Sequence, residues 1–260
     1  MKALVTGASS GLGADFARQL DEMGYDLILV ARRKDKLKKI ASELKGNVEI
    51  ISTDLSSTFN CMRLYNKLKN ENIDVIINNA GFGVFGKFEE TKLEREMDMI
   101  DTNIKSVHLL TKLFLKEFKK RDSGYILNVA SSAAFQPGPL MASYYATKSY
   151  VYNLTCAIYE ELRRDNSNVH ISVLCPGPVN TEFNNVAGVS FSVRALESPK
   201  VVKYALKKMF KNKIVIVPGF TMKLGKFFER FVPTKILIRI TYNIQKKKVN
   251  QWTNLYQKRQ

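Results

Sequence analysis

Residues 6–13 read Thr6-Gly7-Ala8-Ser9-Ser10-Gly11-Leu12-Gly13, and Thr6 is also the last residue of a short apolar run, Ala3–Thr6. Glycines in this spacing allow a tight turn, let the backbone approach a pyrophosphate and let the next helix pack close to the strand. The N-terminus of that helix attracts an anion through its dipole and its free N–H groups. The spacing is GxxxGxG, not the commoner GxGxxG, and an ordinary glycine-rich turn is the alternative. The stretch predicts a strand–turn–helix unit that binds a nucleotide.

β-Branched runs alternate with segments of helical spacing along the chain, as in repeated βαβ units. The expected strands are Ala3–Thr6, Leu27–Ala31, Val48–Thr53, Val75–Asn78, Tyr125–Ala130, Ile171–Cys175 and Ile214–Val217. The expected helices are Leu12–Met23, Lys34–Leu44, Thr58–Asn70, Leu93–Lys120 (long enough to be two), Ser143–Asn166 and Pro199–Phe210. This order predicts an α/β, Rossmann-like fold: a doubly wound, parallel seven-stranded sheet with helices on both faces and a ligand beyond the carboxyl ends of the strands. We expect one domain over residues 1–218 and a C-terminal helical extension over 219–260.

Composition narrows the class of protein. The chain has 260 residues, 45% of them hydrophobic, which excludes intrinsic disorder, collagen and elastic repeats. With no run of about 18 apolar residues and no room for a signal peptide, we expect a cytoplasmic protein. Cys61, Cys156 and Cys175 form no CxxC pair, which suits a reducing compartment. With His108 and His170 as the only histidines, we expect no metal site.

The end of the second expected strand, Leu29-Val30-Ala31-Arg32-Arg33, bears on the choice of cofactor. An enzyme that selects NAD places an acid here to hold the ribose 2′-hydroxyl, and this chain has Ala31. Arg32 and Arg33 would instead attract a 2′-phosphate and grip it with two hydrogen bonds. We therefore predict NADP(H), with Ser9 and Ser10 as further phosphate contacts. The alternative, that the arginine begins the basic face of the next helix, applies to Arg33 more than to Arg32.

Tyr144 and Lys148 lie four residues apart on an expected helix and so project from one face. An ammonium beside a tyrosine lowers the phenol's pKa, and the phenol can then exchange a proton with a carbonyl or alcohol oxygen near neutral pH. Ser131 stands at the carboxyl end of the preceding strand. The three residues indicate an acid–base site. Their neighbours Ser132 and Tyr145 are expected to act as a helper and as a packing residue.

With these motifs on one chain, the sequence resembles a short-chain dehydrogenase/reductase. The matching motifs follow the family's order from residue 3 to about 217: Thr6–Gly13, Asp54, Asn78-Asn79-Ala80-Gly81, Thr102-Asn103-Ile104, Ser131, Tyr144xxxLys148 and Pro176-Gly177-Pro178-Val179-Asn180-Thr181. The resemblance implies that Tyr144 donates or accepts the proton, and that Lys148 lowers the pKa of Tyr144 and holds the nicotinamide ribose. It implies that Ser131 hydrogen-bonds the substrate oxygen and that Asn103 supports a water relay.

The resemblance also implies cofactor contacts: Asp54 and Leu55 flank the adenine, residues 79–81 line the adenosine side, and Val179 and Thr181 meet the carboxamide. The whole expected set is Gly7, Ser9, Ser10, Gly11, Leu12, Gly13, Arg32, Arg33, Asp54, Leu55, Asn79, Ala80, Gly81, Tyr144, Lys148, Pro176, Gly177, Val179 and Thr181. As alternatives, Asp54 can cap the helix that begins near Ser57, and Thr181 can cap a short helix.

Segments expected around the substrate are apolar: 82–85, 135–141 and 183–193. The last also holds Asn184, Asn185, Gly188 and Ser190, as a mobile lid does. This lining favours a hydrophobic ketone or alcohol, such as a steroid, a bile acid or a lipid-derived carbonyl, over a sugar; the alternative is that these aromatics are ordinary core. The family resemblance implies a homodimer or homotetramer built through the long helices near 93–120 and 143–166.

The basic character of the chain is concentrated at its end. Lys and Arg number 41 against 24 Asp and Glu, a net charge of +17, and residues 220–260 hold ten basic residues against Glu229 alone. Apolar residues recur at helical spacing at Leu224, Phe227, Phe228 and Phe231, and again at Ile236, Ile240 and Ile244. Two short amphipathic helices can dock on an anionic membrane, cover the pocket, form a dimer contact or pack as a solvated basic face.

A rival interpretation is a nucleotide-sensing regulatory or nucleic-acid-binding protein on the same fold, with the basic tail as its nucleic-acid contact. That class leaves the set Ser131, Tyr144 and Lys148 without a role, and no recognised nucleic-acid motif accompanies it. We therefore expect an enzyme and no nucleic-acid partner.

Overall fold

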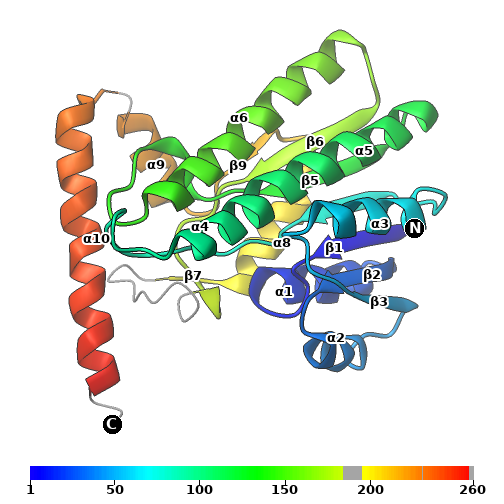
Figure 1. The fold of residues 1–260 in the computed structure, drawn as a ribbon. Coiled ribbons are helices and arrows are strands. Elements are labelled where there is room, and N and C mark those ends of the chain that lie inside the picture. Colours follow the sequence, from blue (N-terminus) through cyan, green and yellow to red (C-terminus); the bar gives the residue numbers. More distant parts are fainter. Residues whose placement is uncertain (184–194, 230, 258–260) are drawn as a thin grey trace.

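The structure is a computed structural model that describes residues 1–183, 195–229 and 231–257, with side chains up to residue 246. Its centre is a parallel sheet in the order β3-β2-β1-β4-β5-β6-β9 (Figure 1). The strands are β1 Lys2–Thr6, β2 Asp26–Ala31, β3 Val48–Ser52, β4 Val75–Asn78, β5 Gly124–Val129, β6 Val169–Leu174 and β9 Val215–Ile216. Successive strands are added toward one edge from β1 to β3 and toward the other edge from β4 to β9, so the strand order reverses between β1 and β4. The expected Rossmann-like fold is confirmed.

Helices cover both faces of the sheet because each buries one apolar stripe against it. On one face lie α1 (Gly11–Glu22), α2 (Lys34–Ala41) and α8 (Ser198–Met209), whose buried residues share one core cluster with β1 and β2. On the other lie α3 (Thr58–Leu68), α5 (Ser106–Arg121) and α6 (Ala142–Arg164). Phe114 and Phe118 of α5 are fully buried there beside Ile126 of β5. The carboxyl ends of the strands stay free for a ligand.

The long segment after β4 is two α-helices joined without a break. A five-residue π-helical turn, Asp101–Lys105, connects α4 (Leu93–Ile100) to α5. Single π-turns inside α-helices are rare and occur often at functional sites. Asn103 lies in this turn and is fully buried.

A ladder of four buried polar side chains ties the second helical layer to the sheet. Asn78 of β4 donates through Nδ2 to Thr111 Oγ1 of α5 at 3.1 Å and to Asn128 Oδ1 of β5 at 2.9 Å. Asn128 Nδ2 in turn donates to Thr155 Oγ1 of α6 at 2.9 Å. Because a buried amide without a partner costs about 1–3 kcal/mol, the ladder holds α5 and α6 at fixed positions along the strands.

Two short elements beside the sheet have no counterpart in the sequence pattern. β7 (Val179–Asn180) pairs in parallel with β8 (Leu196–Glu197), and Ser132–Phe135 form a 3₁₀ turn after β5. The expected lid falls mostly on residues 184–194, which lie outside the described residues.

The chain ends in two helices, α9 (Phe220–Glu229) and α10 (Thr234–Gln257). The prediction of two short helices is wrong for α10, which has 24 residues and runs along one side of the molecule (Figure 1). In the part of the chain that the structure describes, no helix is both long enough and apolar enough to cross a bilayer.

Candidate active site

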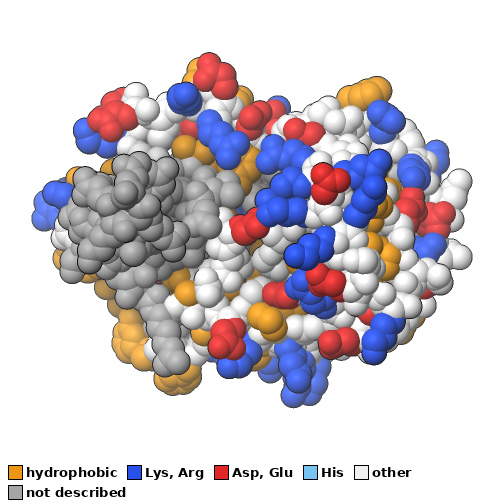
Figure 2. Space-filling model, turned by 90° about the horizontal axis from the view of Figure 1, so that it is seen from below, with side chains coloured by type: hydrophobic (Ala, Val, Ile, Leu, Met, Phe, Trp, Pro, Cys, Tyr) orange, Lys and Arg blue, Asp and Glu red, His pale blue; other side chains and the backbone are white. Residues whose placement is uncertain are grey.

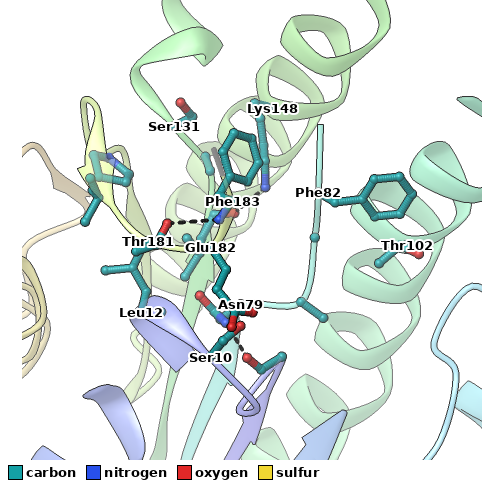
Figure 3. Close-up of a pocket in the computed structure, with 18 of the residues that line it drawn as sticks. Ser10, Leu12, Asn79, Phe82, Thr102, Ser131, Lys148, Thr181, Glu182 and Phe183 are labelled. Carbon is teal, nitrogen blue, oxygen red and sulfur yellow. Dashed lines mark hydrogen bonds between the residues drawn. The ribbon is translucent and has the colours of Figure 1, made fainter. Parts of the chain in front are cut away.

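A cavity of 390 Å³ opens beyond the carboxyl ends of the strands. It is lined by every predicted site residue except two, Gly13 and Asn103, which lie behind its wall. In Figure 3, Ser131 and Lys148 lie at one end of the pocket and Ser10 at the other, with Thr181–Phe183 on one side and Phe82 on the opposite side. The sheet therefore brings residues from across the sequence into one elongated site.

The phosphate turn has the geometry that a dinucleotide needs. Gly7 and Gly11 adopt φ of +66° and +54°, which side chains other than glycine rarely tolerate. A Cβ on Gly13 would lie 2.2 Å from the carbonyl oxygen of Gly7, so only glycine lets α1 approach the strand this closely. Ser10 precedes α1 without capping it through its side chain, and the first-turn N–H groups are left for an anion. The residues present thus fit a pyrophosphate.

Asn79 supports this turn directly. Its Nδ2 donates to the carbonyl oxygens of Thr6 at 3.0 Å and of Gly7 at 3.3 Å, while Thr6 Oγ1 accepts from the backbone N–H groups of Asn79 and Ala80. The structure therefore gives Asn79 a positioning role beside the adenosine contact that the family resemblance implies.

Of the two predicted arginines, Arg33 is the one that reaches the phosphate turn. Its Nη2 donates to Ser10 Oγ at 2.8 Å and to Ser9 Oγ at 3.1 Å, although its backbone caps α2. Arg32 points to solvent, with Nη1 4.0 Å from Asp54 Oδ2. The side chain of Arg33 turns back across the end of the sheet, and both arginines line the pocket.

Arg33 and Lys36 also pair with Glu182, which follows β7 on the other side of the cleft. These hydrogen bonds lower the pKa of Glu182 to about 2, so its carboxylate is charged at all ordinary pH. Figure 2 shows the side of the molecule below α1 and α2, where Lys and Arg side chains gather with Asp and Glu between them. The carboxylate competes with an anionic ligand for Arg33.

Asp54 and Leu55, the residues expected beside the adenine, both lie in the pocket wall. Asp54 Oδ1 accepts from the N–H of Ser56 at 3.0 Å, whereas the cap of α3 is Ser57, which accepts from Asn60. Asp54 is thus not the helix cap, and it stays in the pocket wall next to buried Leu55. Thr181 Oγ1 accepts from the N–H of Phe183 at 3.3 Å, the local geometry of the capping alternative. Its methyl group lies against Gly11.

The expected acid–base group is buried at the far end of the pocket. Burial raises the pKa of Tyr144, and a hydrogen bond with Ser131 opposes part of that rise. Burial lowers the pKa of Lys148 to about 8. Lys148 Nζ lies 5.8 Å from the centre of the Tyr144 ring and donates to Val129 O at 3.0 Å. The Lys148 ammonium thus bonds the backbone carbonyl of Val129 and not the phenol of Tyr144 in this arrangement.

Asn103 acts on the backbone from within the π-turn. Its Nδ2 donates to Phe82 O at 2.9 Å and to Thr147 Oγ1 at 3.1 Å, and its Oδ1 accepts from the Phe82 N–H at 3.1 Å. A Cβ on Gly81 would meet Asn103 Oδ1 at 2.8 Å and Lys148 Nζ at 3.4 Å. Asn103 thus fixes the segment that carries Gly81 and Phe82 against Lys148.

The substrate end of the pocket is apolar. Phe82, Met141, Tyr144 and Phe183 share one cluster, and the rings of Phe183 and Tyr144 lie 5.4 Å apart. The aromatics at 82 and 183 are therefore pocket lining, as expected, whereas Phe135 packs on Tyr152 of α6.

Both tail helices contact residues that line this pocket. Gln245 Nε2 of α10 donates to Tyr145 OH at 2.5 Å, and Met222 of α9 lies over Gly177. Tyr145 is thus a packing residue that also forms pocket wall. Of the roles expected for the tail, covering the pocket is the one that the described contacts support.

Sequence reasoning missed three contributors to the site: Glu182, Thr147 and Gln245. Glu182 lies next to Thr181 in the sequence, but its partners are far away along the chain, so no spacing reveals the pairing. Thr147 was visible one position before Lys148. Gln245 lies one turn beyond Thr241, on the polar stripe opposite Ile240 and Ile244.

Within the described residues, no group of three or more His, Cys, Asp or Glu side chains is placed to hold a metal ion. All three cysteines are free thiols.

The known proteins that this chain is similar to are described as dehydrogenases, reductases or oxidoreductases. A family model described as short chain dehydrogenase matches residues 1–188. An uncharacterized oxidoreductase of Staphylococcus epidermidis is 32% identical over 210 residues, which cover 78% of this chain and 90% of that protein. A very-long-chain 3-oxoacyl-CoA reductase of Mycosarcoma maydis is 31% identical over 222 residues, which cover 81% of this chain and 61% of that protein. The solved structure of a short-chain dehydrogenase from Sphingobium yanoikuyae in complex with NADPH has a TM-score of 0.79 at 29% identity, covering 84% of this chain and 88% of that one.

Proposed function

The chain belongs to the short-chain dehydrogenase family of oxidoreductases, and we propose that it uses NADP(H) to interconvert a hydrophobic ketone and a secondary alcohol. Enzymes of this family act on CH–OH and C=O groups. The observation that carries the proposal is the placement of Ser131, Tyr144 and Lys148 at the apolar end of a pocket whose other end is a phosphate turn.

The geometry supports a separate role in the reaction for each of these residues. NADP(H), when bound, supplies or accepts the hydride. Tyr144 delivers a proton to the carbonyl oxygen or removes it from the alcohol, and Ser131, which already bonds Tyr144, orients that oxygen. Lys148 presents a buried positive charge next to them, which favours the phenolate as the proton leaves. Asn103 holds the Gly81–Phe82 backbone beside Lys148, which positions that charge.

Four features support NADP(H) over NAD(H). Ala31 stands where an acid would repel a 2′-phosphate, and Arg33 bonds both serines of the phosphate turn. The Sphingobium relative is described in complex with NADPH. Arg32, exposed at the same edge, is a second cation within reach of the adenosine end.

The substrate class rests on the lining. Phe82, Met141 and Phe183 share one apolar cluster with Tyr144, and such a wall binds apolar groups better than sugar hydroxyls. The Mycosarcoma relative is named for a fatty-acyl carbonyl. A steroid, a bile acid or a lipid-like carbonyl fits this wall.

We propose a homodimer or homotetramer in the cytoplasm. The helices expected to pair expose apolar side chains, Met97 on α4 and Tyr150 on α6. Free thiols at Cys61, Cys156 and Cys175 accord with a reducing compartment.

The test is turnover by Tyr144→Phe, measured as NADPH absorbance against a panel of steroid, bile-acid, fatty-acyl and small aldehyde substrates. Losing the proton donor should lower kcat by about 10²–10⁴-fold, with NADPH binding kept. Tyr145→Phe is the matched control, because it removes a phenol from the next residue and should keep most turnover. Substantial activity in Tyr144→Phe, or equal loss in both variants, would refute the assignment.

A further inference from the structure

Each tail helix leaves an apolar stripe exposed on its outer side. A surface helix of a globular protein buries its apolar stripe and exposes its polar one. On α10, Ile236, Ile240 and Ile244 follow one another at four-residue spacing and are 49%, 48% and 45% exposed. Thr241 and Gln245 of the same helix are buried, at 2% and 1% exposure. Thr241 and Gln245 thus face inward together with the half-buried Leu237 and Ile238, and the stripe of three isoleucines faces outward.

The shorter helix α9 repeats this orientation. Its inward residues are Met222, Lys226 and Glu229, and Lys226 Nζ lies 4.4 Å above the Phe135 ring. The outward residues are large and apolar: Phe220, Leu224, Phe227 and Phe228, with Phe231 just beyond the helix. The expected solvated basic face is only partly present on α9, where Lys223 is exposed but Lys226 packs inward.

These outer faces are held in place by specific contacts on their inner sides. Gln245 donates to Tyr145, and Lys226 donates to Tyr152 OH at 3.4 Å. Neither helix can rotate to bury its apolar stripe without breaking these bonds. Both helices lie at the same side of the molecule, with α10 outermost (Figure 1).

The charge around the apolar stripes indicates what covers them. Lys223, Lys235, Arg239 and Lys246 are exposed on these helices. Residues 220–260 hold ten basic residues and one acidic residue, so the segment accounts for +9 of the net +17. A second copy of the chain would bring an equal positive charge against this face, and like charges repel. The matching surface is anionic and also accepts aliphatic side chains, a combination that a lipid bilayer offers.

We propose that the outer faces of α9 and α10 dock on an anionic lipid bilayer. The phenylalanines and isoleucines enter the boundary between headgroups and acyl chains, and the lysines and Arg239 reach the lipid phosphates with their stems along the same face. Because α9 and α10 contact Gly177 and Tyr145 of the pocket wall, docking places the pocket beside the membrane. Only this last consequence, the supply of a membrane-dissolved carbonyl, rests on the proposed function.

The experiment is co-sedimentation of the full chain with phosphatidylcholine vesicles, with and without phosphatidylglycerol. We expect binding to the phosphatidylglycerol vesicles that weakens with added salt, and little binding to phosphatidylcholine alone. Phe227→Ser/Phe228→Ser should lower the partition coefficient at least about tenfold. Lys235→Gln/Arg239→Gln should lower it about fivefold for each charge removed.

Matched control variants distinguish binding through the tail from non-specific adsorption to vesicles. Phe59→Ser/Phe88→Ser removes two phenylalanines that are more exposed than the tail pair but lie outside the tail, and Lys203→Gln/Lys207→Gln removes two exposed lysines from α8. Both controls should bind vesicles as the unchanged protein does. Thermal melting should show all variants folded, since each altered side chain is exposed.

Four outcomes would overturn the proposal. The first three are equal binding to both kinds of vesicle, equal losses in tail and control variants, and displacement of the vesicles by DNA. A dimer that dissociates in Phe227→Ser/Phe228→Ser on size exclusion would also overturn it, because a second copy would then cover the stripe. The assay uses neither cofactor nor turnover, so its failure leaves the proposed reaction untouched.

Discussion

Replacing Arg33 by alanine tests the choice of cofactor most directly. Arg33 donates three hydrogen bonds to the serines of the phosphate turn and one to Glu182 Oε2 at 2.9 Å. If it grips the 2′-phosphate, its loss removes a hydrogen bond to a charged group, which contributes about 1.5–3 kcal/mol. Arg33 must first release Glu182, an exposed ion pair that is worth at most about 1 kcal/mol. The net loss is therefore about 1–2 kcal/mol.

That loss corresponds to an increase of about 5- to 30-fold in the Kd for NADPH, measured by fluorescence titration. The Kd for NADH should stay within about twofold, because NADH has no 2′-phosphate to lose. Glu182→Gln keeps the side chain's shape and removes its charge, which frees Arg33 for the ligand. This variant should therefore lower the Kd for NADPH, by up to about fivefold. Equal weakening of both cofactors by Arg33→Ala, or weaker NADPH binding in Glu182→Gln, would show that Arg33 holds the turn and not the 2′-phosphate.

Two further changes test the buried end of the pocket. Lys148→Met should abolish turnover and yet raise the melting temperature below pH 8. The buried amine has a pKa of about 8 against 10.5 when unfolded, so the unfolded chain binds the extra proton between those values and wild-type stability rises with pH there. The difference in melting temperature between Lys148→Met and the unchanged protein should shrink from pH 8 toward pH 10.5 in calorimetry. A difference that does not change with pH would contradict the lowering of the Lys148 pKa by burial. Gly81→Ala should cost about 1–3 kcal/mol in urea unfolding and lower kcat/KM, because its Cβ would press on Asn103; Gly225→Ala, which meets no atom within 4 Å, should do neither.

The sheet could be read from the sequence because its strands are buried on both faces. Strands in that environment are nearly continuous apolar runs, as Leu27–Ala31 and Val75–Asn78 are, and they stand out between helical segments. The short pair β7 and β8 has only two residues in each strand, too few to make a pattern. The glycine turn and the pair Tyr144 and Lys148 were predictable because local backbone and helix geometry fix them.

What could not be read from the sequence depends on long-range packing. The path of Arg33 to Ser9, Ser10 and Glu182 is set by how the ends of β2 and β7 face each other across the cleft. The pKa of Tyr144 depends on burial and on where Lys148 finds its acceptor. Helical spacing located the stripes on the tail correctly but gave no information on which stripe faces the core.

The buried ladder of Asn78, Thr111, Asn128 and Thr155 matters for anyone who builds chimeras from this chain and a relative. A junction between its first and last members can join an amide from one parent to an apolar residue from the other, leaving a polar group unpaired inside the core. Junctions before Asn78 or after Thr155 transfer the ladder whole. The same block contains the four proposed reaction residues, Asn103, Ser131, Tyr144 and Lys148. Residues 78–155 are therefore the natural unit of recombination, in which the proposed chemistry and the polar core that supports it are inherited together.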